Sequence, residues 1–128
     1  MTRMLLITLL VLSHGPVYAE WAWVDRNMHG MSAYADPDTI DRKGDLVKMW
    51  VLFDYKTVLT VAGKSYGSNR VQDQYDCADQ RSRMLSLTWF AGNMGTGDIR
   101  FHDDEGHKWR PVPPGSIIEA LRNFACSK

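Results

Sequence analysis

Two cysteines, Cys77 and Cys126, constrain the fold of this 128-residue chain more than any other feature. An even number of cysteines in an exported protein is most simply explained by a disulfide. Only one intramolecular pairing exists, and closing a loop of roughly 50 residues stabilises a fold by about 4 kcal/mol. Two free thiols or a redox pair are the alternatives, although the Cys-x-x-Cys spacing of redox sites is absent. If the chain is exported, its fold must bring residue 77 next to the C-terminal segment.

The N-terminal residues indicate export. A positive charge at Arg3 precedes an apolar run over 4–12 and a polar exit, which is the order of a secretory signal peptide. Cleavage is expected after Ala19, because Val17 and Ala19 occupy the two positions where signal peptidase requires small side chains. A membrane anchor is the alternative, but the apolar run is far shorter than the roughly 20 residues that span a bilayer. We therefore predict a signal peptide over 1–19.

The remaining residues form one expected domain over 20–128. Its 109 residues suffice to bury a single core. The 14 basic and 15 acidic side chains of this part give a formal charge of −1 with neutral histidines. Phosphate binding draws on an excess of clustered Lys and Arg, so this balance argues against a nucleic-acid partner. After signal cleavage we also expect no stable insertion into a membrane.

Alternating apolar side chains predict strands over much of this domain. The clearest strand covers 46–55, where apolar residues from Val47 to Tyr55 share one face. Other strands are predicted near 21–23 and over 31–35, 71–77, 84–91 and 98–102. The last two would form a hairpin with Ile99 facing the core, and the Gly- and Ser-rich residues 63–69 indicate a loop.

The C-terminal segment predicts a helix. Ser116 and Glu119 have the spacing of a capping box, and an apolar stripe follows from Ile117 to Ala125. The helix is expected to end or distort near Ala125, because Cys126 would otherwise lie far from the stripe. The predicted fold class is α+β: an antiparallel sheet of five or six strands, with a C-terminal helix packed on one face and tethered by the disulfide.

One dense group of metal-ligand residue types lies between His102 and His107, with Asp103, Asp104 and Glu105 between them. Two imidazoles with carboxylates could hold zinc. The preferred interpretation is a solvated hairpin turn, because acidic residues and a glycine follow a predicted strand. No nucleophile motif or phosphate-binding loop occurs either. We therefore predict no catalytic, cofactor-binding or metal site, and no enzymatic activity.

Five tryptophans, at positions 21, 23, 50, 89 and 109, are the most informative candidates for binding. Trp contributes disproportionately to protein interfaces, although core packing is its more frequent role. Trp21, Trp23 and Trp50 are the predicted partner-facing aromatics. Trp50 shares a strand face with Lys48 and Asp54, so we expect this face to be solvent-accessible.

Several features occur together in a recognisable order. They are Trp21, Tyr34 and Asp36 before Thr39-Ile40, Val47 to Trp50 followed by Asp54-Tyr55, Asp76-Cys77 with Arg81 and Arg83, and Trp109 through Pro114-Gly115-Ser116 to Cys126. In these residues the chain resembles the surface-adhesin protein E-like family of Gram-negative bacteria. The resemblance covers nearly all of 20–128 and implies a sheet with a disulfide-tethered C-terminal helix.

The resemblance implies a non-enzymatic protein of the cell envelope, and the family's namesake is an adhesin for host matrix and serum proteins. Our leading hypothesis is a binding module for a protein partner, with a homodimer through a strand edge as a further expectation. No cysteine near Ala19 could carry a lipid, so a periplasmic location is expected, with the cell surface or secretion as alternatives. A small periplasmic inhibitor of an enzyme such as lysozyme is the alternative function, and a metalloenzyme at His102 and His107 is the third.

Overall fold

A computed structural model describes residues 20–128. The predicted signal peptide over 1–19 lies outside the described residues. Within them, no helix is long and apolar enough to cross a membrane.

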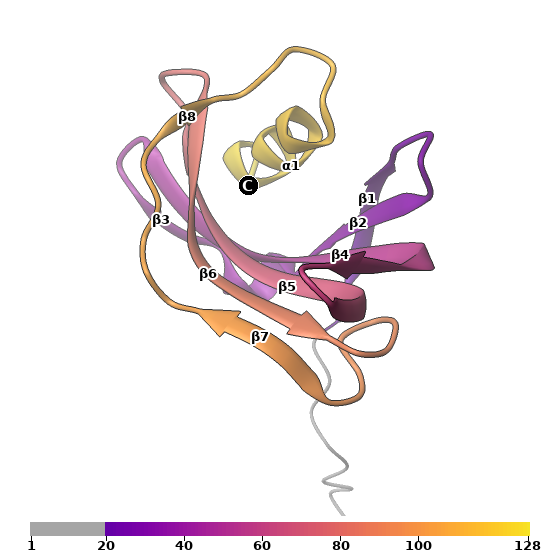
Figure 1. Ribbon diagram of the computed structural model, residues 1–128. Coiled ribbons are helices and arrows are strands. Elements are labelled where there is room, and N and C mark those ends of the chain that lie inside the picture. Colours follow the sequence, from indigo (N-terminus) through magenta and orange to yellow (C-terminus); the bar gives the residue numbers. More distant parts are fainter. Residues whose placement is uncertain (1–19) are drawn as a thin grey trace, which may run out of the picture.

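A single antiparallel sheet makes up most of the structure. Its strands run in the order β1-β2-β4-β5-β6-β7, while β3 pairs with β4 and β8 pairs with β6. The sheet curves around one helix, which lies on its concave face (Figure 1). The elements are β1 (Ala22–Arg26), β2 (Met31–Ala35), the 3-10 turn η1 (Pro37–Thr39), β3 (Asp41–Lys43), β4 (Leu46–Val61), β5 (Lys64–Asp76), β6 (Arg81–Phe90), β7 (Ile99–Asp103), β8 (Arg110–Pro111) and α1 (Ile117–Cys126).

The predicted α+β class with five or six strands is therefore wrong. The sheet has eight strands and dominates the fold, while α1 is a minor element. Two of the unexpected strands are short: β3 holds three exposed residues and β8 holds two. They lack an alternating pattern because neither of their faces is buried, so sequence periodicity could not reveal them.

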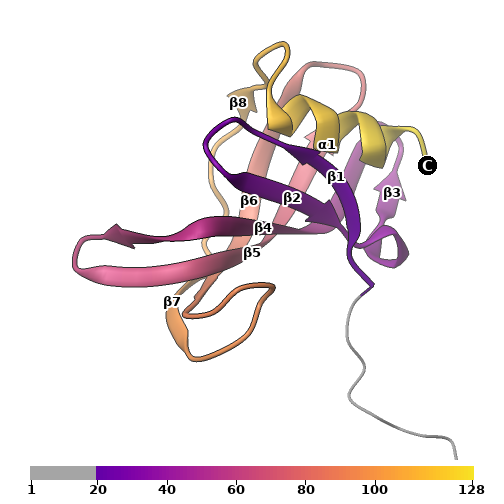
Figure 2. The same ribbon diagram turned by 90° about the vertical axis from the view of Figure 1, so that its right-hand side faces the viewer.

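The predicted loop over 63–69 is also wrong. Residues 64–69 belong to strand β5. The chain reverses between β4 and β5 at Ala62 and Gly63, which have φ angles of 50° and 77°. The resulting hairpin projects from the rest of the sheet (Figure 2). Gly67 lies inside β5, and the position requires a glycine because the backbone of Gly92 approaches it. A Cβ on Gly67 would lie 2.9 Å from the Gly92 carbonyl group. Here glycine indicates close packing rather than a loop.

The segment after β7 does not form the expected hairpin turn. Strands β7 and β8 both pair antiparallel with β6, so the chain continues along the same edge of the sheet instead of reversing. The predicted pairing of 84–91 with 98–102 is confirmed by β6 and β7. The inward orientation of Ile99 is wrong, because this side chain is 61% exposed.

The core lies between the concave face of the sheet and α1. Met49, Val51 and Tyr75 are fully buried there with Leu121 and Ala125 of the helix. The predicted helix start is confirmed: Ser116 is the N-cap, and its Oγ accepts a hydrogen bond from the Glu119 N–H at 3.1 Å. The Glu119 side chain accepts from the Gly115 N–H at 3.0 Å, which completes a variant of the capping box.

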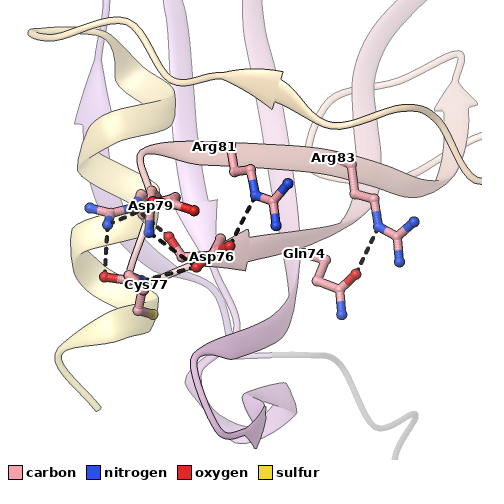
Figure 3. A network of polar contacts seen from close by, with 8 residues as sticks. Gln74, Asp76, Cys77, Asp79, Arg81 and Arg83 are labelled. Carbon is pink, nitrogen blue, oxygen red and sulfur yellow. Dashed lines mark hydrogen bonds and ion pairs between the residues drawn. The ribbon is translucent and has the colours of Figure 1, made fainter.

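Two contacts attach the end of α1 to the turn between β5 and β6. The expected disulfide is present, with the Cα atoms of Cys77 and Cys126 5.7 Å apart. Beside it, the buried guanidinium of Arg122 donates hydrogen bonds to the carbonyl groups of Asp76 at 3.0 Å and Cys77 at 3.0 Å, with a longer one to Asp79 at 3.4 Å. Figure 3 shows this turn and the polar network around it. Arg122 thus donates to carbonyl groups at the end of β5 and in the turn that follows it.

Replacement of Arg122 by alanine should destabilise the oxidised protein by about 2–4 kcal/mol, because buried carbonyl groups would lose their donors. Urea unfolding with the disulfide intact measures this change. The matched control is Arg42→Ala: Arg42 is exposed and donates to the Cys126 carbonyl at 3.2 Å, a bond for which water competes, so a change of only about 0.5 kcal/mol is expected. Equal unfolding midpoints for the two variants would contradict the anchoring role of Arg122.

Candidate protein-binding surface

The face of the sheet opposite α1 is the candidate site, and we call it the outer face. Val47, Met49 and Val51 of β4 point into the core, so Lys48 and Trp50 point to the outer face. Trp50 lies opposite Gln72 of β5, which in turn lies opposite Ser86 of β6. Polar and aromatic side chains therefore share this face, while the helix covers the other one (Figure 1).

Trp50 lies where β4 changes its edge partner. Residues 46–48 of β4 pair with β3 and residues 51–55 pair with β2, so Trp50 falls in the gap between them. The η1 turn fills this gap: the Trp50 N–H donates to Thr39 Oγ1 at 3.0 Å, and the Trp50 carbonyl accepts from the Asp36 N–H at 3.1 Å. These two hydrogen bonds hold the backbone of Trp50 in place and so fix the point from which its indole projects.

A shallow cavity of about 310 Å³ opens beside this indole, lined by Trp21, Asp36, Thr39, Trp50 and Arg70. The Arg70 guanidinium carbon lies 5.2 Å from the centre of the Trp50 ring and 5.5 Å from that of Phe90. A guanidinium between two aromatic rings makes favourable cation–π contacts and is held in place. The cavity therefore presents a positioned cation beside an indole.

The three predicted partner-facing tryptophans all lie on or beside the outer face. Trp21 and Trp50 are partly buried and share the cavity, whereas Trp23 is 58% exposed. Trp23 lies opposite Tyr34, and Tyr34 lies opposite Leu52 on the outer side of β4. Of the other two tryptophans, Trp89 stacks on Tyr66, and Trp109 contacts Arg81 and Arg83.

A second aromatic–cation cluster lies near the β5–β6 turn. The guanidinium carbons of Arg81 and Arg83 lie 4.5 Å and 4.8 Å from the centre of the Trp109 ring. Arg83 donates to the Gln74 side chain at 2.8 Å, as Figure 3 shows. Asp76, Arg81, Arg83 and Trp109 were all among the residues that suggested the family, and the structure brings them together.

The Asp76 carboxylate organises this end of the outer face. One of its oxygens accepts from the N–H groups of Ala78 at 3.0 Å and Asp79 at 3.1 Å, and the other accepts from Arg81 at 2.9 Å. The hydrogen bond from Asp79, followed by that from Arg81, lowers the pKa of the Asp76 carboxyl. Asp76 is thus ionised at neutral pH and holds Arg81 beside Trp109.

The histidine-rich segment does not form a common site. His102 pairs with Asp104 at 2.9 Å and contacts Thr88, whereas His107 pairs with Asp103 at 3.3 Å. Among residues 20–128, no cluster of three or more His, Cys, Asp or Glu could hold a metal ion. Each imidazole instead has a separate carboxylate partner.

The fold is similar to that of solved structures of Haemophilus influenzae protein E. Crystal form II of Haemophilus influenzae protein E has a TM-score of 0.66 at 14% sequence identity, over 87% of this chain and 90% of that chain. A selenomethionine form of the same protein gives 0.65 at 14% identity, over 88% and 89%. These likenesses establish a shared fold. No curated protein sequence matches the chain.

The amino-acid sequence assigns the chain to a protein family. The model of the family "Surface-adhesin protein E" matches residues 21–127. The chain therefore belongs to the surface-adhesin protein E family, as its resemblance indicated.

Arg70 is the residue of the outer face that the sequence did not suggest. The Gly- and Ser-rich stretch before it predicted a loop, so the register that places Arg70 opposite Leu52 was hidden. Continuing the alternation of β5 backward from Tyr75 would have assigned Arg70 to the face opposite the core.

Asp76→Asn should destabilise the protein at pH 7 and have less effect at about pH 2.5. Because folding lowers the pKa of Asp76, the stability from its ionised form is present above the unfolded-state pKa of about 3.9 and is lost as the pH falls through the lower folded-state pKa. Urea midpoints at the two pH values test this. Asp41→Asn, on the exposed strand β3, is the control and should change neither midpoint appreciably. A penalty for Asp76→Asn that persists unchanged at low pH would contradict the assignment.

Proposed function

We propose that this protein is an exported, non-enzymatic binding module that engages a protein partner through its outer face. The observation that carries this proposal is the Trp50–Arg70 cavity, which Trp21 also lines, together with the exposed Trp23. Trp and Arg are enriched among the residues that dominate protein–protein binding energy. Membership of the surface-adhesin protein E family supports a partner outside the cell, such as a host matrix or serum protein.

The outer face favours a partner with acidic groups near its contact surface. Lys48, Arg70, Arg81 and Arg83 lie on this face, and among them Arg81 is paired with a carboxylate at 2.9 Å. Planar guanidinium groups bind carboxylates in a bidentate manner, and stacking on an aromatic ring reduces the entropy lost on binding. Electrostatic complementarity of this kind raises association rates and selects among partners.

The domain organisation that fits this role is a signal peptide over 1–19 followed by one domain over 20–128. Removal of the signal would leave Trp21 and Trp23 close to the new N-terminus. The periplasm and the outer cell surface are both compatible compartments for a disulfide-bonded domain. The family favours the surface.

A second candidate function is inhibition of an enzyme such as lysozyme. The observation that favours it is the projecting β4–β5 hairpin (Figure 2), which carries three exposed apolar side chains: Val58, Leu59 and Val61, at 56%, 37% and 45% exposure. A narrow projection with apolar residues suits insertion into a cleft. Loss of lysozyme inhibition in a Val58→Ser variant, with binding to other partners unchanged, would support this alternative.

Affinity capture with oxidised Glu20–Lys128 against matrix and serum proteins, and against envelope extract, tests the proposal. A saturable ligand should lose affinity by at least about tenfold for Trp50→Ala or Arg70→Ala, because both residues line the central cavity. Met28→Ala is the matched control, since Met28 is 90% exposed and lies outside that cavity. A ligand whose affinity is the same for all three variants would exclude the Trp50–Arg70 cavity as its binding site and so contradict the proposal.

A further inference from the structure

A second cavity, of about 420 Å³, lies on the concave side of the sheet, opposite the outer face. It is enclosed by strands β4, β5 and β6, by the segment 107–113 and by the first turn of α1. This volume falls within the range of roughly 300–1,000 Å³ that is typical of small-molecule sites. The inference that follows is independent of the proposed function, since it does not involve the Trp50–Arg70 cavity and depends instead on Asp73, Lys108 and Arg110.

The interior of this concave cavity is apolar and its rim is cationic. Phe53, Val71 and Met84 of the sheet, with Ile118 of the helix, supply the apolar wall. Lys108 and Arg110, both exposed, lie at the rim. Apolar walls bind a hydrophobic body without regard to charge, whereas two exposed cations at an entrance favour an anionic group there.

Asp73 is the acidic group that lines this cavity. It is 6% exposed, and in the described part of the chain the side chain that hydrogen-bonds its carboxyl is Tyr75, at 3.2 Å. Burial raises the pKa of Asp73 to about 7, and the Tyr75 hydrogen bond opposes this effect. At and below neutral pH a large fraction of Asp73 is therefore protonated and able to donate a hydrogen bond.

The charges around Asp73 come from few elements. Arg83 of β6 and His107, Lys108 and Arg110 of the following segment line the same cavity, while β4 and α1 contribute the apolar Phe53 and Ile118. His107 is engaged with Asp103 at 3.3 Å. Among the residues that line the cavity, Asp73 is the one acid, so no permanent negative charge faces an entering anion when Asp73 is protonated.

We propose that the concave cavity binds a small amphipathic carboxylate. Its carboxylate group lies between Lys108 and Arg110, and its aliphatic or aromatic body contacts Val71 and Ile118 above Asp73. An amphipathic cation would place its charge beside two cations at the rim. A neutral apolar molecule would partly desolvate both cations without pairing them, which costs free energy.

The pH dependence of this site follows from Asp73. When Asp73 ionises, the apolar body of the ligand covers a charged carboxylate, which is unfavourable, and that charge also repels the carboxylate group of the ligand across a low-dielectric cavity. Affinity should therefore be highest below the folded-state pKa of about 7 and decrease as the pH rises through it. This dependence distinguishes the site from nonspecific adsorption of a fatty acid to an apolar surface.

Calorimetric titration of the oxidised domain with decanoate at about pH 6 tests the proposal, with decanol and decyltrimethylammonium as probes of the charge. Decanoate should bind saturably and at least about tenfold more tightly than either probe. The double variant Lys108→Ser/Arg110→Ser should lose this preference. The variant Arg26→Ser/Lys43→Ser removes two exposed charges remote from the cavity and should keep it. Equal affinity for decanoate and decanol, or no binding of decanoate, would overturn the proposal.

Asp73→Asn provides a second readout that does not depend on loss of binding. The amide has nearly the shape of the protonated acid and cannot ionise, so decanoate affinity should be the same at about pH 6 and about pH 8.5. The decanoate affinity of the wild-type protein should decrease by about tenfold between these two pH values, as expected for one added charge in a partly buried site. Amide chemical shifts of Ser82, Met84 and Ile118 should change on titration, because these residues line the cavity. A wild-type affinity independent of pH, or shifts confined to other residues, would refute the assignment.

Discussion

The attachment of α1 to the β5–β6 turn is the contact on which the rest of the structure depends. A curved sheet with one apolar face needs a cover, and α1 supplies it through Leu121 and Ala125. A helix of ten residues is too short to be stable alone in water. The disulfide fixes its C-terminal end covalently, and Arg122 adds hydrogen bonds to the same turn. These links keep the helix against the sheet at little further entropic cost.

A single short helix also determines which surfaces stay open. It covers one part of the concave face and leaves the cavity above Asp73 at its N-terminal end. The outer face has no helix over it (Figure 1), so its large aromatic side chains are covered by neighbouring side chains of the same face. Arginines stacked on Trp50 and Trp109 provide this cover. The exposed cation–aromatic clusters are thus a consequence of a sheet covered on one side only, and they make that face suitable for a partner.

The sequence predicted the parts of this fold in which one face is buried. Apolar alternation identified 46–55, and a capping box identified the helix start at Ser116. Strands β3 and β8 and residues 56–61 of β4 are exposed on both faces, so they have no periodicity to detect, whereas residues 66–69 of β5 are all buried and give no alternation either. The candidate tryptophans were found by residue type alone. Arg70 and Asp73 were missed, because their importance depends on cross-strand neighbours that only the register of β5 reveals.

One irregularity of β6 assigns its side chains to the two surfaces. Gln72 lies opposite Ser86 and Asp73 lies opposite Met84, so Leu85 is an extra residue that forms a β-bulge. Because side chains alternate between faces, this residue reverses the alternation in the preceding part of the strand. Met84 and Ser82 consequently face the concave cavity, while the guanidinium groups of Arg81 and Arg83 reach Trp109, with Arg83 also at the edge of that cavity. Without the bulge the alternation would turn both arginines toward the concave face. The bulge therefore separates an apolar cavity from a cationic surface within one strand.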